Sequence, residues 1–223
     1  MKSMLILLVF FLFFLFSTSA SASSRGMNFD GVNDHYKVDL GSDWSSPNWT
    51  VESTFTLRSW HTQQFEHLFS LGGNHLLTMY VNSIDKRIVF KGYFNGEKKE
   101  FFVSNLALNY EYHIAAVFNG SSLVVYLNNK QVQSISVSNP VDQLNSFLFI
   151  GADGYNSNFF KGEINEFALW NTALTQSEIF DSSKSGNEQN LRAWYHFNPL
   201  STGKAYDLSH HGHDASGYNF PDL

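Results

Sequence analysis

The sequence predicts an all-β fold, a sandwich of two antiparallel sheets with one short helix near the C-terminus. Two observations support this prediction. Apolar and polar residues alternate with a period of two along short segments, as in strands that bury one face. Clusters of Gly, Asn, Asp and Ser separate these segments at intervals near the roughly 8–12 residues typical of sandwiches.

The strands follow from this alternation. It is clearest where Val51, Phe55 and Leu57 fall on one face of a predicted strand. Asn119-Gly120 predicts a tight turn between two further strands. The same pattern predicts strands at residues 26–30, 35–40, 66–71, 76–81, 87–94, 100–103, 113–118, 123–127, 131–137, 146–151, 162–170 and 191–197.

One helix is predicted after Thr175. Thr175 and Glu178 have the spacing of a capping box, in which each residue bonds the other's backbone N–H. Ile179 and Phe180 supply apolar contacts, and Ser185-Gly186 is the expected end. Because the helix is short, we expect it to cover one end of the sandwich.

Residues 1–22 have the order of a secretory signal peptide. Lys2 precedes an apolar run over residues 4–16, and an Ala-x-Ala signal ends at Ala22. The run is shorter than the about 20 residues that cross a bilayer, so cleavage is favoured over retention as a signal anchor. We therefore expect a secreted domain at residues 23–223, with no membrane span after cleavage.

Composition excludes several classes of function. The chain of 223 residues has no cysteine, so neither disulfides nor a thiolate zinc site can stabilise it. A domain of this length can bury enough apolar surface without them. The net charge is −6 and the basic residues are scattered, which argues against nucleic acid and heparin-like partners.

Two tripeptides are candidate N-glycosylation sites. They begin at Asn48 and Asn119. Asn119 lies at the predicted hairpin turn, where a glycan is easily accommodated, whereas Asn48 directly precedes a strand. The sequence therefore predicts a glycoprotein if the host modifies secreted chains.

Six segments together resemble a known family. They are residues 26–36, 48–60, 110–132, 162–174, 191–197 and 205–215. In this order they are similar to LamG-like jellyroll domains of the concanavalin A-like lectin/glucanase group. The resemblance implies a jelly roll for residues 23–223. It does not name the function, because the scaffold hosts lectins, adhesion modules, pentraxin-like proteins and glycosidases.

A structural calcium site is one expectation from the resemblance, which implies that the first and last strands pair. Asp30, Asn33 and Asp34 would then approach Asp207 and Asp214, and these oxygens suit calcium. The alternative is that these side chains cap turns by accepting backbone N–H bonds.

Histidines mark the last loop, where the family more commonly carries Gly and Asn. His210, His211 and His213 are close in sequence. Converging imidazoles bind zinc or copper. Adjacent loop side chains usually diverge, however, so a solvated loop is the alternative.

Glycoside hydrolysis requires two carboxylates about 5 Å apart in a retaining enzyme. Glu163 and Glu166 are the candidates, but an odd spacing places them on opposite faces of a regular strand. The positions that would share a face with Glu163 hold Asn165 and Phe167. We therefore expect no catalytic residues and no enzyme activity.

Two loops have the composition of ligand-binding sites, in which aromatic faces combine with amide side chains. Packing of the rings beneath their own loops is the alternative. The candidate residues are Tyr155, Asn156, Asn158, Phe159, Trp60 and His61.

The sequence thus predicts a secreted, non-catalytic recognition module that binds a glycan or an extracellular protein, as in cell adhesion. A glycoside hydrolase of the same fold and a pentraxin-like assembly module are the alternatives. The oligomeric state and the ligand do not follow from the sequence.

Overall fold

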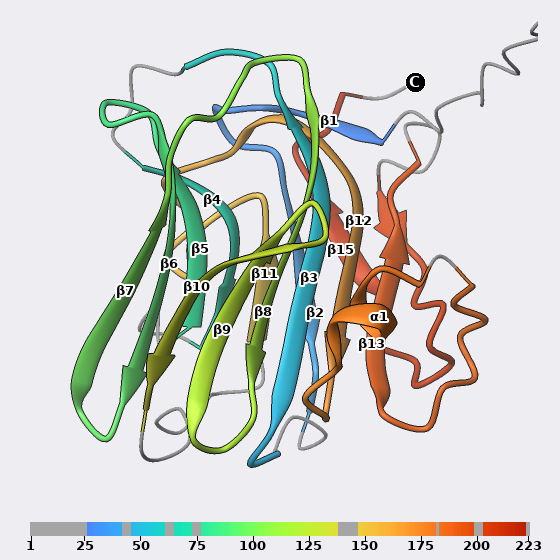
Figure 1. The fold of residues 1–223 in the computed structure, drawn as a ribbon. Coiled ribbons are helices and arrows are strands. Elements are labelled where there is room, and N and C mark those ends of the chain that lie inside the picture. The colour runs from blue at the N-terminus through green and yellow to red at the C-terminus, as the bar shows by residue number, and fades with distance from the viewer. Residues whose placement is uncertain are drawn as a thin grey trace, which may run out of the picture.

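The computed structural model describes residues 26–41, 46–60, 65–72, 77–137, 147–181, 183–198 and 203–221. These residues form two antiparallel β-sheets that pack face to face, with one short helix near the C-terminus (Figure 1). The predicted fold class is confirmed. The predicted signal peptide lies outside the described residues. No helix within the described ranges is long and apolar enough to cross a membrane.

Sheet A contains seven strands. β12 is its centre, since β3 pairs along one edge while β1 and β13 share the other. The sheet consists of β1 (Met27–Asp30), β12 (Lys161–Trp170), β3 (Trp49–Leu57), β8 (Glu111–Phe118), β9 (Ser122–Leu127) and β10 (Lys130–Ser136), with β13 (Leu191–His196) beside β12.

Sheet B contains eight strands. It lies behind β8–β10 in Figure 1, with β7 at one edge. In order of pairing it consists of β14 (Lys204–Ala205), β15 (Ala215–Tyr218), β2 (His35–Asp39), β11 (Phe147–Ile150), β4 (Phe65–Leu71), β5 (Leu77–Asn82), β6 (Arg87–Phe94) and β7 (Glu97–Val103).

Two of these strands, β14 and β15, are not predicted by the sequence. The segment Ala-Ser-Gly-Tyr of β15 has no run of β-branched or alternating residues. It is a strand because its backbone pairs with β2, where Ser216 lies opposite Lys37 and Tyr218 opposite His35. Tertiary pairing therefore creates a strand where local preference is weak.

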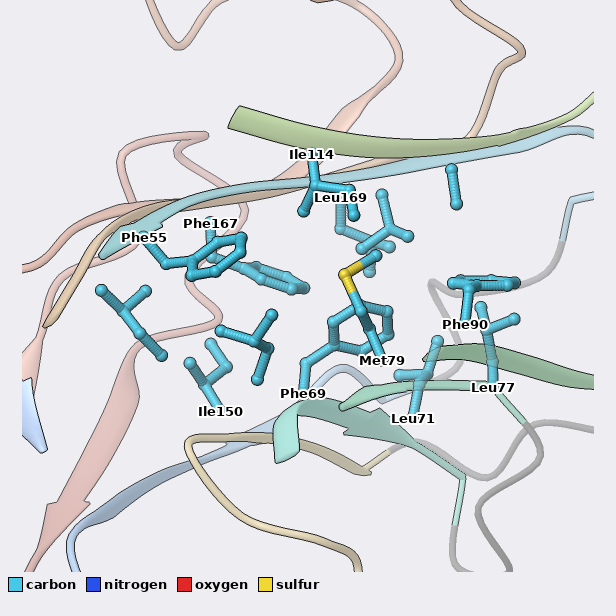
Figure 2. Close-up of a cluster of buried hydrophobic side chains, with 14 of the residues drawn as sticks. Phe55, Phe69, Leu71, Leu77, Met79, Phe90, Ile114, Ile150, Phe167 and Leu169 are labelled. Carbon is cyan, nitrogen blue, oxygen red and sulfur yellow. The ribbon is translucent and has the colours of Figure 1, made fainter. Parts of the chain in front are cut away.

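The core lies between the sheets and is rich in aromatic rings. Figure 2 shows Phe55, Ile114, Phe167 and Leu169 of sheet A facing Met79 and its neighbours in sheet B. The rings of Phe69 and Phe167 meet edge to face across the sheets, with centroids 5.5 Å apart. Such pairs add about 0.5–1.5 kcal/mol to the stabilisation from burial.

The capping box at the start of α1 (Gln176–Ile179) is confirmed. Glu178 N donates to Thr175 Oγ1 at 3.4 Å, and Thr175 N donates to the Glu178 carboxylate at 2.7 Å. The expected end at Ser185-Gly186 is wrong. The helix stops at Ile179, and Phe180 already has a non-helical backbone (φ −98°, ψ 11°).

The expected position of α1 at one end of the sandwich is also wrong. The helix lies over the outer face of sheet A (Figure 1). Ile179 packs there in a second apolar cluster with Ala115, Val117 and Ala168, which point away from the main core. Because these outward-facing apolar residues are stabilised by removal from water, the helix packs over them.

We predict that Thr175→Ala destabilises the protein by about 1 kcal/mol, because the Glu178 N–H loses its acceptor. Thr175→Ser keeps a hydroxyl and serves as the matched control. Urea unfolding of the three proteins measures the difference. An equal loss in both variants would contradict a role for the cap.

Candidate functional site

An open groove lies on the outer face of sheet B. Alternation along β5, β6 and β7 sends Tyr80, Lys91, Tyr93 and Glu100 outward while their neighbours enter the core. The groove has a volume of about 250 Å³. Its lining consists of Phe65, His67, Tyr80, Lys91, Tyr93, Lys98, Glu100 and Asn158.

Aromatic rings form much of the groove surface. The rings of Phe65 and Tyr80 meet edge to face at 5.2 Å, and the His67 ring lies 5.1 Å from Tyr80. Tyr93 lies on β6, two residues beyond Lys91. The three larger rings are half-buried and thus keep part of their surface open to solvent. The surface therefore combines apolar faces with polar groups, as ligand sites do.

The loop that carries Asn158 is held rigidly by Asp153. The buried carboxylate of Asp153 accepts from Tyr155 N and Ser157 N, from the Ser157 hydroxyl at 2.6 Å and from Asn158 Nδ2 at 2.7 Å. Burial alone would raise the pKa of Asp153, but these hydrogen bonds outweigh it and lower the pKa. His67 N also donates to Asn158 O at 2.9 Å, which fixes the loop to β4.

The structure places the predicted ligand residues in different surroundings. Asn158 lines the groove, whereas Tyr155 and Asn156 are exposed in the same loop outside its lining. Phe159 is half-buried 5.8 Å from the His35 ring. Trp60 packs against the main core. His61 lies outside the described residues.

Sequence reasoning did not identify the sheet residues of the groove. The signal in the sequence that could have identified them is the set of residues at the outward positions of the alternating strands. Tyr80, Lys91, Tyr93 and Glu100 all occupy outward positions of predicted strands. What the sequence lacks is the strand order that places these positions side by side.

The two candidate calcium loops are not brought together. The last strand pairs with β2, but antiparallel to it, with Tyr218 opposite His35. Asp34 therefore lies at one end of this strand pair and Asp214 at the other. Among the described residues, no three His, Asp or Glu side chains form a group that could hold a metal ion.

Asp side chains in both loops have hydrogen-bond or ion-pair partners within or next to their own loop. Asp30 Oδ1 accepts from Val32 N at 2.7 Å and from Asn33 N at 3.2 Å. Asp207 Oδ1 accepts from Ser209 N at 2.9 Å, while Asp214 pairs with Lys204 at 2.7 Å. These contacts are those of turn-capping side chains.

Asp34 is an exception within the first loop. Burial raises the pKa of Asp34 to about 6. Its Oδ2 accepts from Asp30 N at 2.9 Å, while its buried Oδ1 has no hydrogen-bond partner among the described residues. The predicted calcium site required Asp207 and Asp214 as well, and the separation of the two loops gives that shared site no geometric support.

The histidines of the last loop do not converge on one point. The rings of His211 and His213 lie nearly parallel with centroids 6.3 Å apart. His213 Nδ1 is 3.2 Å from Asp39 O, and exposed His210 has a positive φ of 62°. Metal binding by this loop has no geometric support in the described residues.

The prediction that Glu163 and Glu166 face opposite sides of β12 is wrong. Ile164 lies opposite Phe55 and Glu166 opposite Thr54, so Asn165 is an extra residue in the strand. Such a bulge reverses the alternation beyond it. Both glutamates therefore lie on the outer face of sheet A.

Both glutamates are engaged in structural contacts. Arg58 forms an ion pair with Glu163, and Gly26 N donates to the Glu163 carboxylate at 2.7 Å. Lys184 Nζ lies 2.9 Å from Glu166, and Trp194 Nε1 donates to it at 2.8 Å. Burial alone would raise the pKa of Glu166, but His196, Lys184 and Trp194 lower it to about 2.

Lys184 joins Glu166 to a second buried carboxylate. Lys184 Nζ is 3.1 Å from Glu52, whose side chain is 2% exposed. Glu52 also accepts from Trp170 Nε1 at 2.9 Å and lies 3.0 Å from His113 Nε2. The network ties the segment after α1 to the outer face of sheet A, which it thereby covers.

The two candidate glycosylation sites are neighbours in space. Trp49 pairs with Phe118, so Asn48 lies beside the turn that contains Asn119. A Cβ on Gly120 would lie 3.0 Å from Asn48 Oδ1. Asn119 is exposed whereas Asn48 is half-buried.

Comparison with known families agrees with this architecture. A laminin G family model, described as the concanavalin A-like lectin/glucanases superfamily, matches residues 29–180. The chain belongs to this superfamily. Its two-sheet sandwich is thus the fold expected of a concanavalin A-like domain.

Solved structures share the concanavalin A-like fold at low sequence identity. A candidate carbohydrate binding protein from Bacteroides ovatus ATCC 8483 aligns with a TM-score of 0.68 and 14% identity, over 88% of this chain and 58% of that chain. The binding domain of botulinum neurotoxin serotype G aligns with a TM-score of 0.52 and 11% identity, over 71% of this chain and 46% of that chain.

A curated relative matches only a short segment. Pappalysin-1 of Mus musculus is 35% identical over 72 residues, which are 30% of this chain and 4% of that protein. The chain therefore corresponds to a small part of that relative.

We predict that Glu166→Gln lowers stability by about 2–3 kcal/mol at pH 7. The folded pKa lies below the ordinary 4.5, so the ionised group stabilises the fold above about pH 4.5 and ceases to do so as the pH falls toward 2. The two unfolding curves should therefore converge in acid.

Glu97→Gln is the matched control, because this side chain is 71% exposed and its loss should leave stability nearly unchanged. Urea unfolding between pH 2 and 8 makes both measurements. A constant difference between wild type and Glu166→Gln across this range would contradict the assignment.

Proposed function

We propose that this protein is a secreted, non-catalytic recognition module that binds a glycan in the groove of sheet B. The observation that supports the proposal is that the rings of Phe65, Tyr80 and Tyr93 line one open groove together with polar side chains. Ring faces suit the apolar faces of sugars, and amide and charged groups suit their hydroxyls. A flat groove on a rigid sheet also costs little conformational entropy on binding.

The rigid loop of Asn158 supports the same proposal. Its carboxamide is held at the groove by Asp153, so it needs no ordering when a ligand binds. The fold and the comparisons support a binding module in the coarse sense, and the Bacteroides ovatus protein of the same fold is itself described as a candidate carbohydrate binding protein. The groove gives the finer proposal of a glycan ligand.

The contacts of the two glutamates on β12 support a non-catalytic role. Two-carboxylate hydrolysis needs an acid that is protonated near neutral pH. Glu166 has a pKa of about 2 and so remains ionised. Glu163 is engaged by Arg58 and by the backbone of Gly26.

Secretion is proposed from the sequence of residues 1–22, which has the order of a signal peptide. Superfamily membership agrees with an extracellular binding role. An extracellular protein partner is the other outcome that a binding test can reveal.

We predict that Tyr80→Ala and Tyr93→Ala each weaken glycan binding about tenfold or more, because each removes an aromatic face from the groove. Binding is measured on a glycan array and then by calorimetry with the best ligand. Tyr206→Ala is the matched control, since Tyr206 is 64% exposed and lies outside the groove.

Circular dichroism and thermal melts establish that the tyrosine variants fold. Tyr80→Phe keeps the ring and should retain most of the affinity. Wild-type affinity in both alanine variants, or binding of no glycan by the wild type, would contradict the proposed site.

We also predict that the protein is exported from eukaryotic cells with a glycan on Asn119. Asn119 is exposed at a turn, whereas Asn48 is half-buried beside Gly120. Asn119→Gln should therefore abolish the gel shift that an N-glycosidase removes, while Asn48→Gln should not. Retention of the full chain in the cytosol would contradict the secretion proposal.

A further inference from the structure

Lys91 occupies the middle of the groove. It lies on β6 between Thr78 of β5 and Glu100 of β7, which are its partners in the two neighbouring strands. The side chain faces outward and is half-buried, and it lines the hollow together with the Tyr93 ring. Its Nζ atom is 6.0 Å from the centroid of that ring.

Glu100, the acid opposite Lys91 in the sheet, is already paired with another lysine. Lys98 Nζ lies 3.1 Å from Glu100 Oε1 on the same strand. Asp153 also acts on Lys91 electrostatically, but its carboxylate is buried and accepts hydrogen bonds from its own loop. Within the described part of the chain, no carboxylate forms an ion pair with Lys91.

The surroundings of Lys91 therefore leave its positive charge undercompensated. Burial, the largest influence, lowers the pKa of Lys91, and Lys98 lowers it further while Glu100 and Asp153 raise it. A half-buried ammonium group that no carboxylate contacts directly gains from an anion that a ligand brings.

The rest of the protein limits what kind of anion fits. The chain carries a net charge of −6, so its overall field repels a polyanion. One lysine that lacks a direct ion pair and lies beside aromatic rings suits a single charged substituent on an otherwise uncharged ligand. An isolated acidic sugar has this chemistry, and a densely sulfated chain does not.

We propose that the groove selects glycans that carry an isolated anionic group, and that Lys91 pairs with this group while the neighbouring rings contact the sugar face. The inference rests on the proposed glycan-binding function and specifies its ligand class. The anionic group is a carboxylate or a sulfate ester, which share the negative charge that Lys91 requires.

The test uses pairs of probes that differ only in charge. One pair is a tetrasaccharide with one glucuronic acid residue and the same tetrasaccharide with glucose at that position. A second pair is sialylated lactose and the same trisaccharide with its carboxylate converted to the uncharged methyl ester. A singly sulfated lactose distinguishes sulfate from carboxylate, and heparin represents a polyanion.

Affinities are measured for the wild type, Lys91→Met, Lys91→Arg and Lys99→Met. We expect the wild type to bind at least one charged probe about tenfold more tightly than its neutral counterpart, with a preference that weakens in high salt. Lys91→Met should remove the preference, and Lys91→Arg should retain it. Lys99→Met is the matched control, because Lys99 already pairs with Glu97 at 2.7 Å and lies outside the groove lining.

The outcomes distinguish failure of the proposed role of Lys91 from failure of the proposed glycan-binding function. Equal binding of charged and neutral probes, or a preference that survives in Lys91→Met, would overturn the role of Lys91 but leave glycan binding standing. Stronger binding of heparin than of every singly charged probe would overturn the isolated-charge requirement. Binding of no probe and of no array glycan would overturn both proposals.

Discussion

The packing of aromatic rings between the two sheets is the interaction on which the rest of the structure depends. The described residues have no covalent cross-link, so burial must hold the layers together. Contacts such as Phe69 with Phe167 and Trp49 with Phe90 join the layers directly. Because a strand alternates its side chains, every strand that contributes to this core also presents a second face, and the two outer faces are free to differ.

The outer face of sheet A is used for structure. Its central residues are apolar, and α1 with the segment that follows it covers them. Lys184, in the segment after α1, holds that segment on the sheet by forming ion pairs with Glu52 and Glu166. A buried network of this kind specifies a single arrangement, since any unpaired member would be costly. Burial alone would raise the pKa of Glu166, but its contacts with His196, Lys184 and Trp194 lower it, so this carboxylate belongs to the structural network.

The outer face of sheet B has the opposite character. Among the described residues no helix covers it between β4 and β7, and aromatic and charged side chains form an open groove. The loop of Asn158 borders the groove and is fixed by Asp153 and by β4. Rigid sheet and rigid loop together give a preformed site, and the undercompensated charge of Lys91 gives that site a basis for selecting among ligands.

The sequence by itself determined the strands other than β14 and β15, the sandwich and the capping box, because alternation and capping depend on residues close along the chain. It also predicted Asn158 as a ligand residue from loop composition. Only the tertiary structure decided that Tyr80, Lys91 and Glu100 share one groove with Asn158. The order in which strands β4, β5, β6 and β7 pair cannot be predicted from any local sequence pattern. The tertiary structure likewise decided that Asn165 bulges from β12 and reverses the face of Glu166, because a bulge arises from the register between strands.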